Sequence, residues 1–186
     1  MAHGAGSSAL PSPSQILETL PVRPEDGSGY ARSSFKLWVD DDRNGCDTRR
    51  EVLIVESLRP VKVGNRCSIS GGQWFSVYDG VTTTNATSFD IDHLVPLKEA
   101  WDSGAKSWTA QRRQEYANDL RTAFALVAVS ASSNRSKGDR DPAEWMPPRR
   151  EYWCQYVIEW IGVKATWGLA VDAVEKNALQ RVLSGC

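Results

Sequence analysis

His93 is the side chain of this sequence best suited to acid–base chemistry near neutral pH. It lies in the run Phe89-Asp90-Ile91-Asp92-His93-Leu94-Val95-Pro96, between acidic residues in an apolar frame, and the other histidine, His3, is in a Gly/Ser/Ala-rich leader. An unperturbed imidazole titrates near pH 6.5, and its neutral form is an effective base at neutral pH. We therefore expect His93 to be a general base. The alternative is a strand-end histidine hydrogen-bonded to a neighbouring carboxylate.

A second segment, Leu126 to Asp139, adds groups of complementary chemistry. It begins as a short apolar strand and continues through small hydroxyl residues that suit a helix N-cap. Asn134 and Lys137 follow three positions apart and so lie on one face of the expected helical turn. The two segments together predict a strand with its acid and histidine, a return strand, and a short helix that carries Asn and Lys.

This order resembles the HNH (His-Me finger, ββα-metal) nucleases, including the HNH domain of RNA-guided CRISPR nucleases and the secreted bacterial and fungal nucleases of the DUF1524 type. The core of the resemblance covers Asp90 to Asp139, and it extends through Trp108, Tyr116–Leu120 and Asp141–Pro148. Each half of the pattern is weak alone, whereas the ordered pair is fairly specific. The resemblance implies a metal-dependent endonuclease that cuts DNA, double- or single-stranded, to leave 5′-phosphate ends, with RNA as a further substrate.

The resemblance also implies which residues act as the base and which hold the metal. Phosphodiester hydrolysis needs an activated water and a metal that takes up charge on the phosphate. His93 would be the base, and Asp92 and Asn134 would be the metal ligands. Asp90 shares the strand face of Asp92 and is expected to ligate the metal or to orient a ligand. Oxygen ligands suit magnesium, manganese or calcium, and zinc can also occupy such sites in crystals.

The expected helix also carries two basic side chains, Arg135 and Lys137. Both are candidates for phosphate contacts or leaving-group stabilisation, and Lys137 is expected to be a catalytic residue. The alternative is a solvated basic helix start. HNH proteins commonly carry a middle Asn or His that braces the base. The equivalent place here, near Phe124-Ala125, has neither, so Asn118 or a backbone group would have to serve.

An acidic loop earlier in the chain matches a calcium-binding pattern. Residues 40–51 satisfy D-x-[DN]-x-[DN]-G-x5-E, and the expected calcium ligands are Asp40, Asp42, Asn44 and Glu51. Cys46 falls inside the loop, and the run at 51–56 resembles a strand more than an exiting helix. The competing interpretation is an acidic turn that joins two strands.

Four cysteines and two glycosylation sequons indicate secretion. Three pairings are conceivable; we favour Cys46–Cys67 and Cys154–Cys186, because each closes a loop within its own half of the chain. The alternative is four buried thiols. Sequons occur at Asn85-Ala86-Thr87 and Asn134-Arg135-Ser136. A glycan on Asn134 would block the expected metal site, so this position should stay bare.

Composition limits the remaining choices. The 186 residues carry a net charge of −1, unlike a protein that packages nucleic acid. No apolar run is long enough to span a membrane, and residues 1–10 lack the apolar core of a signal peptide. We expect a secreted monomer without membrane association. An alternative to the enzyme is a non-catalytic, calcium-stabilised module that binds nucleic acid or protein through a degenerate HNH core.

The chain is predicted to be an α+β protein, with a ββα-metal finger set in one domain at 14–186 behind a flexible leader at 1–13. The domain would contain a β-rich antiparallel part at 14–87, the HNH core at 88–148 and C-terminal helices at 149–186. Strands are expected at 35–39, 51–56, 62–63, 72–78, 88–94 and 126–129. Helices are expected at 14–20, 99–101, 109–120, from Asp141, at 150–166 and at 172–183, together with the short helix that carries Asn134 and Lys137. Trp153, Trp160 and Trp167 recur every seven residues, which indicates core packing.

Overall fold

Short strand pairs and helices alternate along the protein, whose computed structural model describes residues 10–186. The helices are α1 (Pro13–Thr19), α2 (Thr48–Val55), α3 (Leu97–Asp102), α4 (Ala110–Ala117), α5 (Ala131–Lys137), α6 (Trp153–Trp167) and α7 (Ala173–Leu183). The strands are β1 (Val61–Val63), β2 (Ile69–Gly71), β3 (Trp74–Phe75), β4 (Thr82–Thr83), β5 (Phe89–His93) and β6 (Leu126–Ser130). They pair antiparallel as β1–β2, β3–β4 and β5–β6, and the fold is α+β as predicted.

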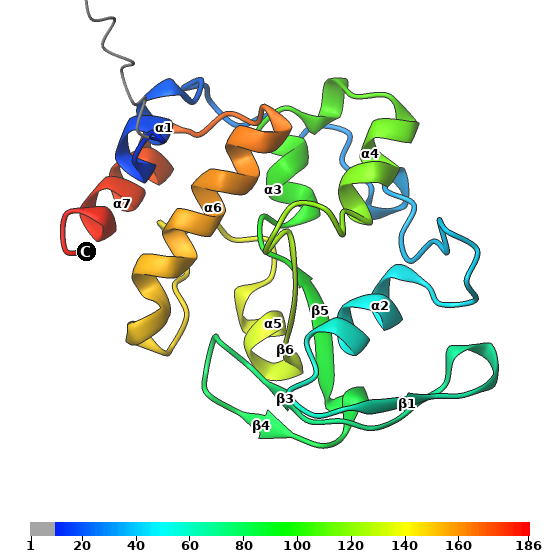
Figure 1. The fold of residues 1–186 in the computed structure, drawn as a ribbon. Coiled ribbons are helices and arrows are strands. Elements are labelled where there is room, and N and C mark those ends of the chain that lie inside the picture. The colour runs from blue at the N-terminus through cyan, green and yellow to red at the C-terminus, as the bar shows by residue number, and fades with distance from the viewer. Residues whose placement is uncertain (1–9) are drawn as a thin grey trace, which may run out of the picture.

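The ββα finger, defined here as β5, β6 and α5, lies near the middle of the molecule (Figure 1). β5 and β6 pair from Phe89 opposite Ser130 to His93 opposite Leu126. β6 leads directly into α5, and the Ser130 side chain caps that helix by accepting a hydrogen bond from the Ser133 backbone N–H. The predicted strand, return strand and short helix are therefore all present.

Both faces of the finger strands are buried, because two apolar clusters flank them. Leu126 and Ala128 of β6 join Phe89 of β5, Trp74 and the apolar residues of α2 in one cluster. Val127 and Val129 point to the opposite face and join the larger cluster around α6. Successive side chains alternate between the two clusters because a strand has a period of two. Since both faces are buried, β6 is a continuous apolar run.

The long helix α6 organises the larger cluster. α1 and α7 pack along α6, on the side away from α4 (Figure 1). Trp160 and Trp167 are buried, and Trp153 is half-buried with its indole N–H donated to the Pro147 carbonyl. The tryptophan repeat is thus part of the core, as its spacing predicted. Within residues 10–186, no helix has both the length and the apolar character needed to cross a bilayer.

The predicted strand at 51–56 is wrong, because these residues belong to α2. Asp47 caps α2 by accepting a hydrogen bond from the Arg50 backbone N–H, and Val52 and Leu53 then face the smaller cluster. A run of β-branched residues favours a strand only weakly, and here packing against β5 and β6 decides the conformation.

Two other predicted elements also differ. Residues 35–39 form no strand; they follow a 3-10 turn at Arg32–Ser34, and Trp38 has a left-handed backbone with φ 54°. Asp141 does accept hydrogen bonds from the Ala143 and Glu144 backbone N–H groups, yet only a turn follows. Pro147 and Pro148 have no N–H to donate, so a helix could not continue through them.

Candidate functional site

A pocket of ≈200 Å³ opens where the end of β5 meets α5. Three segments distant in sequence line it: the turn before the acidic loop, β5 with the residues after it, and α5. The lining residues are Arg32, Ile91, Asp92, His93, Pro96, Leu97, Asn134, Arg135, Gly138 and Asp139. The ββα finger thus brings the acid–histidine pair and the helix asparagine together. A larger hollow of ≈580 Å³ beside α4 contains no histidine.

His93 is fixed by two aromatic rings and one hydrogen bond. Trp38 stacks on one side with ring centroids 5.8 Å apart, and Tyr116 lies at 6.3 Å. The imidazole Nε2 is 2.9 Å from the carbonyl oxygen of Ala117. Because a carbonyl can only accept, Nε2 must carry the hydrogen, which leaves the lone pair on Nδ1. The ring is therefore held in the tautomer that can accept a proton at Nδ1.

Burial keeps this imidazole neutral. The side chain is almost wholly buried, and the loss of water lowers the pKa of His93 to about 4. The Ala117 carbonyl opposes the shift, and the positive charges of Arg32 and Lys137 add to it. At neutral pH the ring is thus a free base rather than a cation.

Asp92 directs one oxygen into the protein interior and keeps the other available. Its Oδ2 accepts hydrogen bonds from the Tyr78 hydroxyl, at 2.6 Å, and from the Lys137 ammonium. Its Oδ1 makes no hydrogen bond with any residue of the 10–186 range, and the residue lines the pocket. The buried interactions therefore orient Asp92 without using all its acceptor capacity.

Lys137 does not lie where a phosphate contact would require it. The side chain is 0% exposed, and its ammonium bonds to Asp92 and to the His93 carbonyl, the latter at 2.9 Å. Burial lowers the pKa of Lys137 and raises that of Asp92, while the ion pair between them acts against both shifts. The phosphate contact predicted for Lys137 needs correction: helical spacing placed it beside Asn134, but its long side chain turns inward to Asp92.

Asn134 lines the pocket and contacts Asp90 of β5. The Asn134 amide donates from Nδ2 to Asp90 Oδ2 at 3.2 Å, which leaves its Oδ1 as an acceptor that bonds to no described residue. Arg135 has a 78% exposed side chain whose Nε is 3.7 Å from the same Asp90 oxygen. Asp90 therefore holds the Asn134 amide by a hydrogen bond and makes only a long contact with Arg135. Its role towards a metal stays a prediction.

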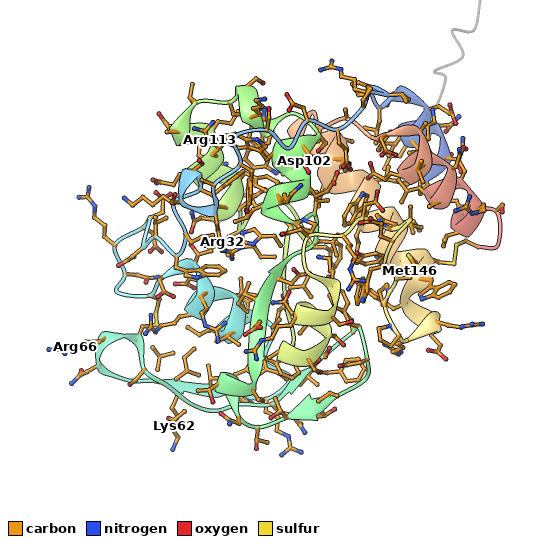
Figure 2. All side chains as sticks on the ribbon, turned by 180° about the vertical axis from the view of Figure 1, so that it is seen from behind. Arg32, Lys62, Arg66, Asp102, Arg113 and Met146 are labelled. Carbon is orange, nitrogen blue, oxygen red and sulfur yellow. A yellow bond between two sulfur atoms is a disulfide. The ribbon has the colours of Figure 1, made fainter. Side chains whose placement is uncertain are left out.

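Arg32 is a pocket residue that sequence reasoning missed. It is exposed on the 3-10 turn and lines the pocket; Figure 2 labels it to the left of the middle of the molecule. No motif surrounds it in the sequence. Only the path of the chain across the finger places it near His93.

The brace that the sequence left unassigned is formed at the end of α4. The Ala117 carbonyl holds the His93 ring, and the next residue, Asn118, anchors this end of the helix. Asn118 accepts hydrogen bonds from the Val39 backbone N–H and the Thr48 hydroxyl, at 3.1 and 2.9 Å, and donates to the Lys36 carbonyl at 2.7 Å. A backbone group thus holds the base, and Asn118 links that group to the acidic loop.

The sequence of this chain matches one known protein family. The family model described as "GmrSD restriction endonucleases, C-terminal domain" matches residues 61–182. The chain belongs to this family. Its members are of the HNH type, in agreement with the resemblance found from the sequence. The matched residues include the whole ββα finger and α4, and membership places the chain among nuclease-type domains.

A fungal protein extends the match beyond the family model. An "Uncharacterized secreted protein" of Arthroderma benhamiae is 44% identical over 172 residues, which cover 92% of this chain and 83% of the relative. No solved structure matches the chain.

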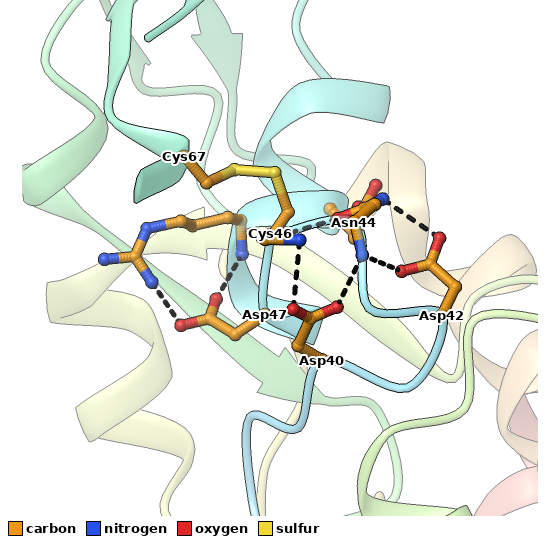
Figure 3. The surroundings of a disulfide bond; sticks show 9 residues. Asp40, Asp42, Asn44, Cys46, Asp47 and Cys67 are labelled. Carbon is orange, nitrogen blue, oxygen red and sulfur yellow. Dashed lines mark hydrogen bonds and ion pairs between the residues drawn. A yellow bond between two sulfur atoms is a disulfide. The ribbon is translucent and has the colours of Figure 1, made fainter. Parts of the chain in front are cut away.

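The acidic loop, residues 40–51, precedes the part matched by the GmrSD C-terminal family. Asp40 accepts hydrogen bonds from the backbone N–H groups of Asn44 and Gly45, at 3.1 and 3.0 Å, and the Asn44 amide donates to Asp42 and Glu51 (Figure 3). The four expected ligands therefore share one loop, and a helix rather than a strand follows it. Calcium binding stays a prediction.

Both predicted disulfides are present in this GmrSD-type domain. Cys46 pairs with Cys67, and Cys154 pairs with Cys186. The first joins the acidic loop to the β1–β2 hairpin (Figure 3). The second joins α6 to the C-terminal residue.

Proposed function

We propose that the protein is a secreted, metal-dependent endonuclease that hydrolyses phosphodiester bonds of DNA, with RNA as a further substrate. One observation carries the proposal. A buried, neutral His93, with Nε2 bonded to a carbonyl and Nδ1 available, lines the same small pocket as Asp92 and Asn134.

In this proposal His93 removes the proton from the attacking water. The acceptor is Nδ1, since Nε2 already donates to Ala117. The stacked rings of Trp38 and Tyr116 limit rotation of the imidazole, so the lone pair keeps its direction. General-base catalysis by a well-placed side chain contributes about 10²–10⁴-fold to the rate.

Two side-chain oxygens in the pocket fit a hard divalent cation, either magnesium or manganese. Asp92 Oδ1 and Asn134 Oδ1 are an anionic and a neutral oxygen donor of the kind such ions prefer, and both residues line the pocket. They would hold the ion, and Asp90 would orient Asn134. The bound ion would supply charge stabilisation at the phosphate.

Arginines flank the pocket and would hold the substrate phosphate. Arg32 and Arg135 both line the pocket, and guanidinium groups pair well with phosphate oxygens. Arg135 is exposed and makes only a long contact with Asp90, so it can turn to a bound nucleic acid without breaking a buried interaction.

A plasmid-digestion assay tests the proposal. Wild-type protein should nick and linearise plasmid DNA with magnesium or manganese and should lose activity with EDTA. His93→Ala should lose about 10²–10⁴-fold in rate while its circular dichroism spectrum is unchanged. If the wild-type protein cuts no DNA with any of several divalent metals, the endonuclease proposal is wrong.

The pH dependence gives an independent check on the base. Protonation of His93 abolishes its role, so the rate should stay high as pH falls from 7 to 5 and decline only near the pKa of about 4. A base with an unperturbed imidazole pKa would instead lose activity near pH 6.5. Initial rates between pH 3.5 and 8 in one metal would distinguish the two, with folding monitored at each pH.

The acidic loop supports a second candidate function, a non-catalytic module stabilised by calcium that binds nucleic acid or protein. Its favouring observation is the four-residue set in the loop at 40–51, followed by a helix. In this case calcium would raise the melting temperature, and the protein would bind DNA in gel-shift assays without cutting it in any metal.

Secretion is part of the proposal and rests on two observations. Disulfides persist in oxidising compartments outside the cytosol, and the chain contains two. The Arthroderma relative is named as a secreted protein.

A further inference from the structure

We propose that Asn85 is an N-glycosylation site and that the second sequon, at Asn134, stays unmodified. The inference rests on the secretion proposed above, through a eukaryotic secretory pathway. It does not depend on the nuclease activity. Asn-X-Ser/Thr is the acceptor sequence for N-linked oligosaccharides, and the chain contains two such sequons with very different surroundings.

The Asn85 sequon lies on an exposed turn between β4 and β5. Asn85 and Thr87 are both exposed, and the sequon opens a 3-10 turn at Ala86–Ser88. Asn85 Oδ1 accepts hydrogen bonds from the Thr87 backbone N–H and hydroxyl, at 3.0 and 2.8 Å. Its Nδ2, the atom that would carry the sugar, bonds to no residue in the described range.

The fold can accept a large group at this position. Asn85 precedes the Phe89 end of β5, while His93 lies at the other end, four residues further along. At about 3.4 Å per residue the strand alone separates the two ends by roughly 14 Å. An oligosaccharide on Asn85 would therefore be attached on the surface near the end of β5 that is remote from His93.

The Asn134 sequon is already engaged in the fold. Asn134 is half-buried on α5, and its Nδ2 donates to Asp90. The hydroxyl of Ser136 accepts the indole N–H of Trp145 at 3.2 Å. A glycan on Asn134 would break the Asp90 contact and fill the ≈200 Å³ pocket, so a chain modified there could not form the finger.

The reaction is an ordinary glycosyl transfer. The donor is a lipid-pyrophosphate oligosaccharide of the secretory pathway, and the acceptor is the Asn85 side-chain amide. A bond forms between Nδ2 and C1 of the first sugar, and the bond from C1 to the pyrophosphate oxygen breaks. The amide loses one proton, and the lipid pyrophosphate leaves with the electron pair of the broken bond.

Peptide mapping of the full chain secreted from yeast tests the proposal. Peptide N-glycosidase releases the glycan and converts the carrier Asn to Asp, which mass spectrometry of proteolytic peptides detects at each sequon. We expect conversion at Asn85 and none at Asn134. Thr87→Ala and Asn85→Gln should each lose the glycan completely, whereas Thr87→Ser, which keeps a hydroxyl, should retain it.

Each outcome bears on the proposal. An unmodified Asn85 in the secreted wild-type protein would overturn it, and so would a glycan on Asn134 in folded protein. Glycan that remained after Thr87→Ala would place the sugar elsewhere and would also reject the assignment. The readout is mass, so a protein that failed to cut DNA would leave this result intact.

Discussion

The ββα finger and the acidic loop each bring acidic and amide side chains together, but different forces hold them. The finger strands are buried on both faces, and a buried ion pair between Asp92 and Lys137 ties α5 to β5. The loop is exposed and is held by the Cys46–Cys67 disulfide and by turn hydrogen bonds. The finger is therefore shaped by the folding of the whole domain, whereas the loop depends on local constraints.

Removal of Lys137 should produce the largest effect on stability and tests the finger side of this comparison. Lys137→Met leaves the Asp92 carboxylate buried without its partner, which typically costs about 3–5 kcal/mol. Urea unfolding measures the loss. Lys176→Met, which removes a partly exposed pair with Glu18, is the matched control and should cost less than about 1 kcal/mol. Equal losses in the two variants would show that the buried pair has no special role.

Removal of the first disulfide tests the loop side. Cys46→Ser with Cys67→Ser opens a link across 21 positions, and loop-closure entropy predicts a loss of about 3 kcal/mol. Any rise in melting temperature caused by calcium should shrink in this variant and should persist in Cys154→Ser with Cys186→Ser. If calcium stabilises both variants equally, the ion binds outside the loop.

Asn118 connects the two regions and offers a test of their coupling. Asn118→Ala removes the hydrogen bonds to Val39, Thr48 and Lys36, which frees the Ala117 carbonyl to move. As an outer positioning residue, its loss should lower kcat about 10- to 100-fold with little change in KM. Asn118→Asp keeps the two acceptor contacts and should recover part of the rate. If Asn118→Ala changes only KM, Asn118 does not act by positioning His93.

Glu56 should give the smallest effect, at the edge of the finger. Its Oε2 accepts the Ala128 backbone N–H of β6 at 2.9 Å, and burial raises the pKa of Glu56 to about 7. The folded state therefore keeps this proton between pH 5 and 7 when the unfolded chain has lost it. Stability should fall as pH rises through this window, by about 1–2 kcal/mol after allowance for partial exposure.

Glu56→Gln isolates that contribution, because the amide still accepts from Ala128 but does not titrate. The variant should lose this part of the decline between pH 5 and 7 in thermal unfolding. The exposed Glu144→Gln is the control and should follow the wild-type curve. A Glu56→Gln curve that still matches the wild type would assign the pH dependence to other groups.

The finger could be predicted from sequence because its signals are local. The apolar run of β6, the hydroxyl N-cap at Ser130 and the Asp92-His93 pair each specify a short element in isolation. The two disulfide pairings could also be predicted from the sequence, since each closes a loop within one half of the chain. In contrast, the run at 51–56 has strand-like residues, and only the Asp47 cap and contacts with the finger make it helical.

Other parts of the site could not be predicted, because they depend on packing between segments that are distant in the sequence. Lys137 was placed on the correct helix face, but its inward direction depends on Asp92 and Tyr78, which lie far away in sequence. Arg32 reaches the pocket only because its segment crosses the finger. The Ala117 carbonyl is a backbone group, and side-chain identity gives no sign of it.

The stacking of Trp38 on His93 provides the protein with an optical reporter. Indole emission is quenched by a nearby imidazolium and less by neutral imidazole, so the fluorescence of one tryptophan should follow the protonation of the ring beside it. A difference spectrum against Trp38→Phe would subtract the other seven of the eight tryptophans. Titration of the imidazole proposed as the general base could then be observed directly in the resting protein, with neither substrate nor label.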